Sequence, residues 1–223
     1  MKCITIHGVL IHGVSMANVL HKMRIFDRNG QRLYLDNAER KRFIEASKDE
    51  SREDRMFCRI LHDTGCRPSE ALALAAENIM LSEMNIQFRS LKKRKFDKQG
   101  NIKDPEYRLV PVHEKLIDLL DLTFDLKKVQ QNQRDKKQKL FTQSRPTAYR
   151  MVKRVMERAK IKGKMATAKG LRHGFAIALL MGEKPAPIHI VAQVLGHSDV
   201  STTEIYLQAV GTEKRTLVLQ ALE

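Results

Sequence analysis

Cysteines are few in this sequence of 223 residues, and long apolar runs are absent. The three cysteines (Cys3, Cys58 and Cys66) show no metal-ligand spacing, and their odd number favours a reducing compartment. No apolar run approaches the roughly 18–20 residues that a membrane-spanning helix needs. Residues 1–18 contain a single lysine and two histidines, which makes them a poor signal peptide. We therefore expect a cytoplasmic protein with no metal site and no membrane partner.

The sequence also lacks a Gly-x-x-x-x-Gly-Lys-Ser/Thr loop, so it shows no sign of a nucleotide cofactor. What it has in excess is positive charge. Lysine and arginine number 41 against 26 acidic residues, which gives a net charge of +15 and a pI near 9.9. Such a surplus favours a polyanionic partner, either nucleic acid or an anionic membrane surface. A membrane-surface protein would need a basic amphipathic helix with bulky aromatics, which the sequence does not show.

The apolar spacing predicts a mostly helical domain with one small antiparallel sheet. We expect strands around Ile86–Phe88 and at Tyr107–Val112. Between these strands, the basic stretch Lys92–Glu106 forms an extended hairpin tip. Residues 130–139 are polar and low in complexity, which predicts a solvated loop. The expected helices begin near Asp36, Arg52, Pro68, Leu116, Ala148, Gly170 and Ile188, and a short last one follows a Ser201-x-x-Glu204 capping box.

Four segments in order resemble the tyrosine recombinases of the phage integrase family. Thr64-Gly65-Cys66-Arg67-Pro68-Ser69-Glu70 is similar to the first-arginine box, and Gly170-Leu171-Arg172-His173 to the second. Leu195-Gly196-His197 resembles the final box, with Tyr206 nine positions after the histidine. The basic hairpin lies where the family keeps a catalytic lysine. Each box alone is a weak match, but the ordered set spans most of the chain.

The resemblance implies a domain that cleaves and rejoins DNA through a 3′-phosphotyrosine on Tyr206, without a cofactor. Arg67 and Arg172 suit the stabilisation of charge on a phosphate, because a guanidinium binds two oxygens and keeps its charge. The alternative is that both arginines bind structural carboxylates, with Glu70 the nearest. Lys92 is expected to protonate the leaving 5′-oxygen, with Lys93 second, although these lysines could also simply grip phosphates.

Two departures from the family pattern matter. The family commonly has histidine three residues before the second arginine, and this chain has Lys169, which is a poor proton acceptor near neutral pH. Lys169 is therefore expected to give electrostatic support. His197 can donate to a phosphate oxygen, whereas His173 is expected to face elsewhere and to be structural. The second departure is that only about 35 residues precede the first expected helix, where family members usually carry an amino-terminal helical domain. Whether the chain is minimal or a fragment stays open.

The expected organisation is an amino-terminal tail or remnant at residues 1–34, a catalytic domain at 35–211 and a tail at 212–223. That last tail is apolar enough to dock on its own domain or on a neighbouring subunit. The expected partner is double-stranded DNA, bound by a homotetramer that is a monomer or weak dimer when free. Two alternatives remain, a type IB topoisomerase-like enzyme and a non-catalytic DNA-binding regulator with the same fold. The target sequence, the choice among integration, excision and resolution, and the role of residues 1–30 are not readable.

Overall fold

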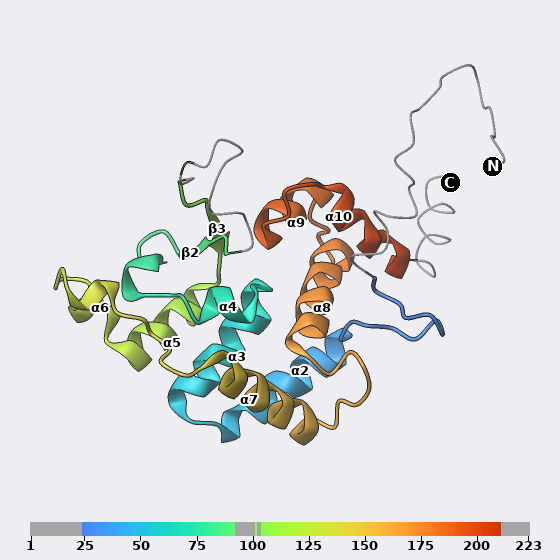
Figure 1. The fold of residues 1–223 in the computed structure, drawn as a ribbon, viewed down its shortest axis with the longest axis horizontal. Coiled ribbons are helices and arrows are strands. Elements are labelled where there is room, and N and C mark those ends of the chain that lie inside the picture. The colour runs from blue at the N-terminus through green and yellow to red at the C-terminus, as the bar shows by residue number, and fades with distance from the viewer. Residues whose placement is uncertain (1–23, 92–100, 102–103, 211–223) are drawn as a thin grey trace, which may run out of the picture.

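The computed structural model describes residues 24–91, 101 and 104–210. Within these ranges the chain is mainly helical with one small antiparallel sheet (Figure 1), which confirms the expected fold class. The α-helices are α2 (Asn37–Ala46), α3 (Arg52–Thr64), α4 (Pro68–Ala71), α5 (Glu114–Phe124), α6 (Leu126–Val129), α7 (Arg145–Arg158), α8 (Ala168–Met181), α9 (Ile188–Leu195) and α10 (Ser201–Glu204). The 3₁₀ helices are η1 (Ser47–Asp49), η2 (Ala76–Asn78), η3 (Asp135–Lys137) and η4 (Ile205–Val210).

The first two helices begin and end where the sequence signals them. The Asp36 side chain accepts a hydrogen bond from the Glu39 amide, and the Glu39 carboxylate accepts one from the Asp36 amide, which is a capping box at the start of α2. Helix α3 starts after Ser51 and ends at Gly65, whose φ of 59° lies in the left-handed region. The buried stripe of α3 faces the main core. Gly65 directly follows this helix and turns the chain toward α4.

The sheet has the order β1 (Ile79–Met80), β2 (Asn85–Arg89) and β3 (Tyr107–Pro111). Ile86 faces Val110 and Phe88 faces Arg108 across the β2–β3 pair. The sequence predicted β2 and β3 but not the two-residue β1, which is too short for an alternation of apolar and polar residues. Residues 92–100, 102 and 103, at the expected hairpin tip, lie outside the described residues.

One local prediction was wrong. Ser201 does not cap α10 with its side chain; Ser201 is the first helical residue, and its amide donates to Asp199 Oδ1 at 2.9 Å. Tyr206 therefore lies in η4, beyond α10. The segment 130–139 is mostly exposed, in agreement with the predicted solvated loop, but its first residue is held by the fold, because Gln130 Nε2 donates to the carbonyls of Ala76 and Ile79 at 2.7 and 2.8 Å. These contacts join residues far apart in the sequence, which local periodicity cannot reveal.

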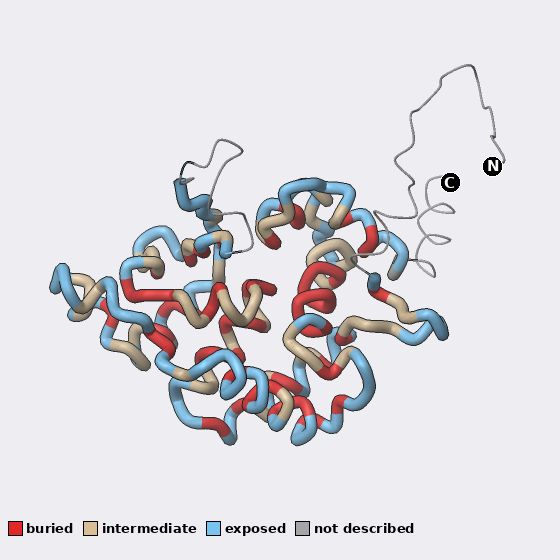
Figure 2. Tube along the Cα trace, in the orientation of Figure 1, coloured by how far each residue is buried: buried red, intermediate tan, exposed pale blue. Residues whose placement is uncertain are grey.

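The buried apolar side chains form two clusters, and Figure 2 marks the buried residues in red along the chain. The larger joins α2, α3, α5, α7 and the sheet. The smaller lies between the outer half of α8, α9 and η4, and it contains Phe175, Ile205 and the fully buried Tyr206. Ile25 also belongs to it, and Leu35 N donates to Gly170 O at 3.1 Å. Residues 24–35, most of which the sequence assigned to a tail, are thus packed against the end of the chain that carries Tyr206.

No helix among the described residues is long and apolar enough to cross a bilayer.

Gly65 allows a test of the turn that leads into the first-arginine box. A Cβ at Gly65 would lie 2.3 Å from Phe175 Cδ1, whereas a Cβ at Gly30, which has a φ of 72°, would meet nothing within 4 Å. Gly30→Ala should therefore cost only backbone strain, about 1–2 kcal/mol. Gly65→Ala adds overpacking, for a total of about 2–5 kcal/mol. Urea unfolding of both variants measures the difference, and equal losses would show that the turn relaxes freely.

Candidate functional site

Arg67 stands at the turn between α3 and α4. Its Nη1 donates to Glu70 Oε1 at 2.9 Å, and its amide donates to Glu70 Oε2 at 2.9 Å. The Glu70 side chain is 1% exposed, while that of Arg67 is 28% exposed. The carboxylate therefore holds one edge of the guanidinium and leaves part of Arg67 open to the surface. Arg67 therefore pairs with a structural carboxylate, Glu70, and is at the same time an accessible cation.

Arg172 is buried on α8, with 6% of its surface exposed. Its Nη1 donates to Gly65 O at 2.7 Å, and its Nη2 donates to Leu195 O at 2.6 Å. Burial, and then the charge of Arg67, lowers the pKa of Arg172 to about 10, so the guanidinium stays protonated at neutral pH. Among the described residues its hydrogen-bond partners are these two backbone carbonyls, and no carboxylate there pairs directly with its charge. A buried cation of this kind has strong affinity for an anion.

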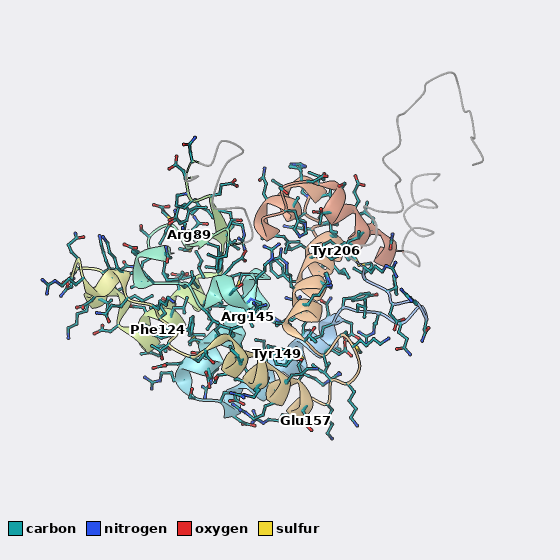
Figure 3. All side chains as sticks on the ribbon, viewed as in Figure 1. Arg89, Phe124, Arg145, Tyr149, Glu157 and Tyr206 are labelled. Carbon is teal, nitrogen blue, oxygen red and sulfur yellow. The ribbon has the colours of Figure 1, made fainter. Side chains whose placement is uncertain are left out.

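Arg67, Lys169, Arg172 and His197 line one cavity of 640 Å³. The elements that supply them are the turn before α4, the first turns of α8 and the segment after α9. Lys169 is exposed and His197 is half-buried. Helix α7 adds Arg145 and Tyr149 to the lining, and both are labelled in Figure 3. The remaining lining residues are Leu33, Pro68, Ser69, Ala148, Val152, Lys164, Thr167, Ala168, Gly170 and His173. Positive charge gathered around a cavity of this size can bind a phosphate group.

Tyr206 lies beside α8 (Figure 3), fully buried next to this cavity. Its hydroxyl is 2.9 Å from His173 Nδ1, and its ring stacks near the His197 ring with centroids 6.5 Å apart. Both histidines line the cavity, whereas Tyr206 is not among the described residues that line it. Burial raises the pKa of Tyr206 to about 12, although the charges of Arg172 and Arg67 oppose that rise. The hydroxyl is therefore protonated at neutral pH.

The expectation that His173 faces away from the site was wrong. Successive side chains on a helix point about 100° apart, so His173 was expected to lie on a different face of the helix from Arg172. However, η4 packs on that side of α8, so His173 reaches Tyr206 and the cavity together. Its Nε2 is buried and has no hydrogen-bond partner among the described residues. Burial, with the nearby charges of Lys169 and Arg172, lowers the pKa of His173 to about 3, so the imidazole is neutral.

Other contacts that sequence reasoning missed hold these groups in place. His197 Nδ1 is 2.8 Å from Thr203 Oγ1, which ties the histidine to α10. Arg108, on β3, bonds both Glu70 and the end of α9. Its position in a strand gave no signal, because the sequence does not show which side chain of α4 faces the sheet. Lys92 and Lys93 lie outside the described residues, and no cluster suited to a metal ion occurs within the described ranges.

The model of the phage integrase family matches residues 33–212, which is most of the chain. The chain belongs to that family. Tyrosine recombinase XerD of Staphylococcus aureus (strain Mu50) is 31% identical over 173 residues, covering 75% of this chain. The match covers 54% of that relative, so this phage integrase family member spans about half the length of its curated relative.

Solved structures show the same fold as this family member. The crystal structure of XerA recombinase matches with a TM-score of 0.62 and 29% identity, over 82% of this chain and 65% of that one. The XerH site-specific recombinase, bound to its difH substrate in a pre-cleavage complex, matches with a TM-score of 0.62 and 22% identity. That match covers 81% of this chain and 55% of the other. At this identity the XerH likeness shows the fold alone.

The buried His173 predicts how stability depends on pH. Its pKa is lower in the folded state than the ordinary value of 6.5, so below that pH the unfolded chain takes up a proton that the folded chain does not. Stability should therefore fall as pH drops below about 6.5, by up to about 1.4 kcal/mol per pH unit for this group. His62, whose pKa burial also lowers, adds to the effect. Urea unfolding between pH 7 and pH 5 measures the slope, above the range in which the carboxylates titrate.

His173→Asn keeps an acceptor near the Tyr206 hydroxyl and removes the titrating ring. We expect this variant to be less stable at pH 7 but to show a shallower slope between pH 6.5 and pH 5. His189→Asn is the matched control, because His189 is exposed and its replacement removes no buried imidazole. An unchanged slope in His173→Asn would contradict the burial of a neutral His173.

Proposed function

We propose that this chain is the catalytic domain of a site-specific DNA recombinase that cleaves and rejoins strands through a 3′-phosphotyrosine. The observation that carries the proposal is the convergence of Arg67, Lys169, Arg172 and His197 on one cavity, with Tyr206 held just behind it. Family membership supports the reaction class, and the +15 charge supports double-stranded DNA as the partner. The complex of the XerH neighbour with its difH substrate is in keeping with this partner.

In the proposed reaction the scissile phosphate occupies the cavity. Arg67 and Arg172 bind its non-bridging oxygens, and Arg172 needs little rearrangement because two backbone carbonyls already fix its plane. Lys169 adds positive charge, and His197 donates to a phosphate oxygen. The preset positions matter because dipoles and charges that are already oriented stabilise a transition state without reorganisation.

Tyr206 Oη attacks the phosphorus and the bond from phosphorus to the 5′-oxygen breaks. The leaving oxygen takes a proton from Lys92, with Lys93 as the alternative donor; both lie outside the described residues. The phenol proton passes to a base before or during attack, because the pKa of about 12 keeps Tyr206 protonated. Rejoining is the reverse, with a 5′-hydroxyl attacking the phosphotyrosine. The bond energy is conserved in that ester, so no cofactor is needed.

Tyr206 must leave its buried position for this attack, since it is fully buried and is not among the described residues that line the cavity. We further propose that the chain works as a homotetramer on two duplexes and is a monomer or weak dimer when free. In this proposal the domain spans residues 35–211. The tail at 212–223 would dock on the same or a neighbouring subunit, and it lies outside the described residues.

The nucleophile can be tested without knowing the target sequence. A library of duplexes with a random core and a nick near its centre is incubated with the protein, and SDS-resistant adducts are recovered and sequenced. We expect a protease-sensitive adduct from the parent protein and none from Tyr206→Phe, because only the phenol oxygen can form the ester. Tyr107→Phe, which alters an exposed tyrosine on β3, is the matched control.

An undiminished adduct from Tyr206→Phe would contradict the proposal. DNA binding without any adduct from the parent protein would indicate a non-catalytic DNA-binding regulator. Relaxation of supercoiled plasmid without strand exchange would indicate a type IB topoisomerase-like enzyme.

Lys169 supplies a second test. Lys169→Ala should slow adduct formation about 10–1000-fold, the usual effect of losing one oxyanion-stabilising donor. Lys169→His should keep substantial activity because it restores a donor at the same place. Lys162→Ala removes a nearby exposed charge that does not line the cavity and serves as the control. If Lys169→Ala reacts as fast as the control, Lys169 does not act on the phosphate.

A further inference from the structure

Arg108 is the second residue of β3 and is nearly buried, with 11% of its side chain exposed. Its guanidinium carbon lies 5.0 Å from the ring centroid of Phe88, which is its partner across the β2–β3 pair. Arg108 is not among the described residues that line the cavity. An arginine close to a cationic site repels the other positive charges unless its own charge is compensated. The contacts of Arg108 therefore indicate its role.

The first contact joins Arg108 to the first-arginine box. Arg108 Nη2 donates to Glu70 Oε2 at 2.7 Å, and the other carboxylate oxygen of Glu70 accepts from Arg67 Nη1 at 2.9 Å. Burial alone would raise the pKa of Glu70, but the hydrogen bond and charge of Arg108 hold it below its usual value. Glu70 therefore stays ionised and is shared by two arginines, one on each side. Without Arg108, the buried carboxylate of Glu70 would keep only its contacts with Arg67 among those described above. The Arg67 guanidinium would then be free to move toward Glu70.

The second contact joins Arg108 to the final box. Arg108 Nε donates to Val194 O at 2.9 Å, in the last turn of α9. Two residues further on, Gly196 has a φ of 68°, and a Cβ there would lie 3.0 Å from Arg108 Cδ. The next residue is His197. The turn that presents His197 thus rests directly on the Arg108 side chain.

We infer that Arg108 is a positioning residue that sets the spacing between Arg67 and His197, and so acts on strand cleavage without touching the phosphate. The guanidinium is planar and donates from Nε and Nη2 in fixed directions, one toward Glu70 and one toward Val194. A lysine has one ammonium group and cannot reach both acceptors in the same geometry. This inference rests on the proposed function for its effect on cleavage, but the positioning itself is a property of the free protein.

The kinetic test uses Arg108→Met, which keeps an unbranched apolar stem over Phe88 and loses both hydrogen bonds. On a duplex recovered from the library, its single-turnover cleavage should be about 10–1000-fold slower than that of the parent protein. The Kd for the same duplex should change by less than about threefold, because one indirect residue adds little beside many phosphate contacts. Arg108→Lys should recover part of the rate. Arg89→Met removes an exposed charge from the neighbouring strand and controls for charge alone.

A double variant separates positioning from general destabilisation. If Arg108 works through Arg67, then adding Arg108→Met to Arg67→Ala should slow cleavage by a much smaller factor than Arg108→Met does alone. Fully multiplicative losses, or a rate equal to that of Arg89→Met, would overturn the inference. A parallel fall in rate and thermal stability that Arg108→Lys does not relieve would do so as well.

A readout in the free protein keeps the inference independent of activity. Nitrogen NMR of the His197 imidazole and of the Arg67 Nε–H group should show shifted resonances in Arg108→Met and unshifted ones in Arg89→Met. Unshifted resonances in Arg108→Met would overturn the positioning role. If the parent protein forms no adduct on any duplex, the proposed function fails, while the NMR comparison still decides whether Arg108 positions these two side chains.

Discussion

The buried guanidinium of Arg172 is the interaction on which the site depends. It binds the carbonyl of Gly65, which ends α3, and the carbonyl of Leu195, which ends α9, while its own backbone belongs to α8. One side chain of α8 thus fixes the ends of two other helices, α3 and α9, relative to its own helix. Carbonyl dipoles solvate the charge but do not neutralise it, so the protein retains a positive charge in a buried environment with little access to water. The same contacts that stabilise the fold leave the site ready for an anion.

The environment of Tyr206 shows a second constraint. The apolar cluster that buries its ring and the His173 hydrogen bond that holds its hydroxyl both favour a phenol kept away from solvent. The proposed attack on phosphorus would require that hydroxyl to reach the cavity. In the proposed reaction, the stability of the free protein and the exposure of Tyr206 therefore oppose each other, and binding of the proposed DNA partner would supply the free energy for the change in position.

The sequence predicted the fold class and most helices, because their signals are local: a capping box at Asp36, a glycine after α3 and apolar stripes at helical spacing. Family boxes led to Arg67, Lys169, Arg172 and His197, which do meet at one cavity. Arg108 and the orientation of His173 could not be predicted, since both depend on which distant element packs against them. Ser201 shows the opposite error. Its local sequence matches a capping box, but in the structure its amide donates to the Asp199 carboxylate instead.

Residues 24–35 give the molecule a mechanical property. Ile25 is part of the wall around Tyr206, Leu33 N donates to Ile25 O at 2.7 Å, and Leu35 is anchored on Gly170. Tension applied to the chain on the amino-terminal side of residue 24 would therefore act first on the packing around Tyr206, and only then on the helices of the main core. Residues 24–35 would thus transmit a pull on the chain to the surroundings of Tyr206.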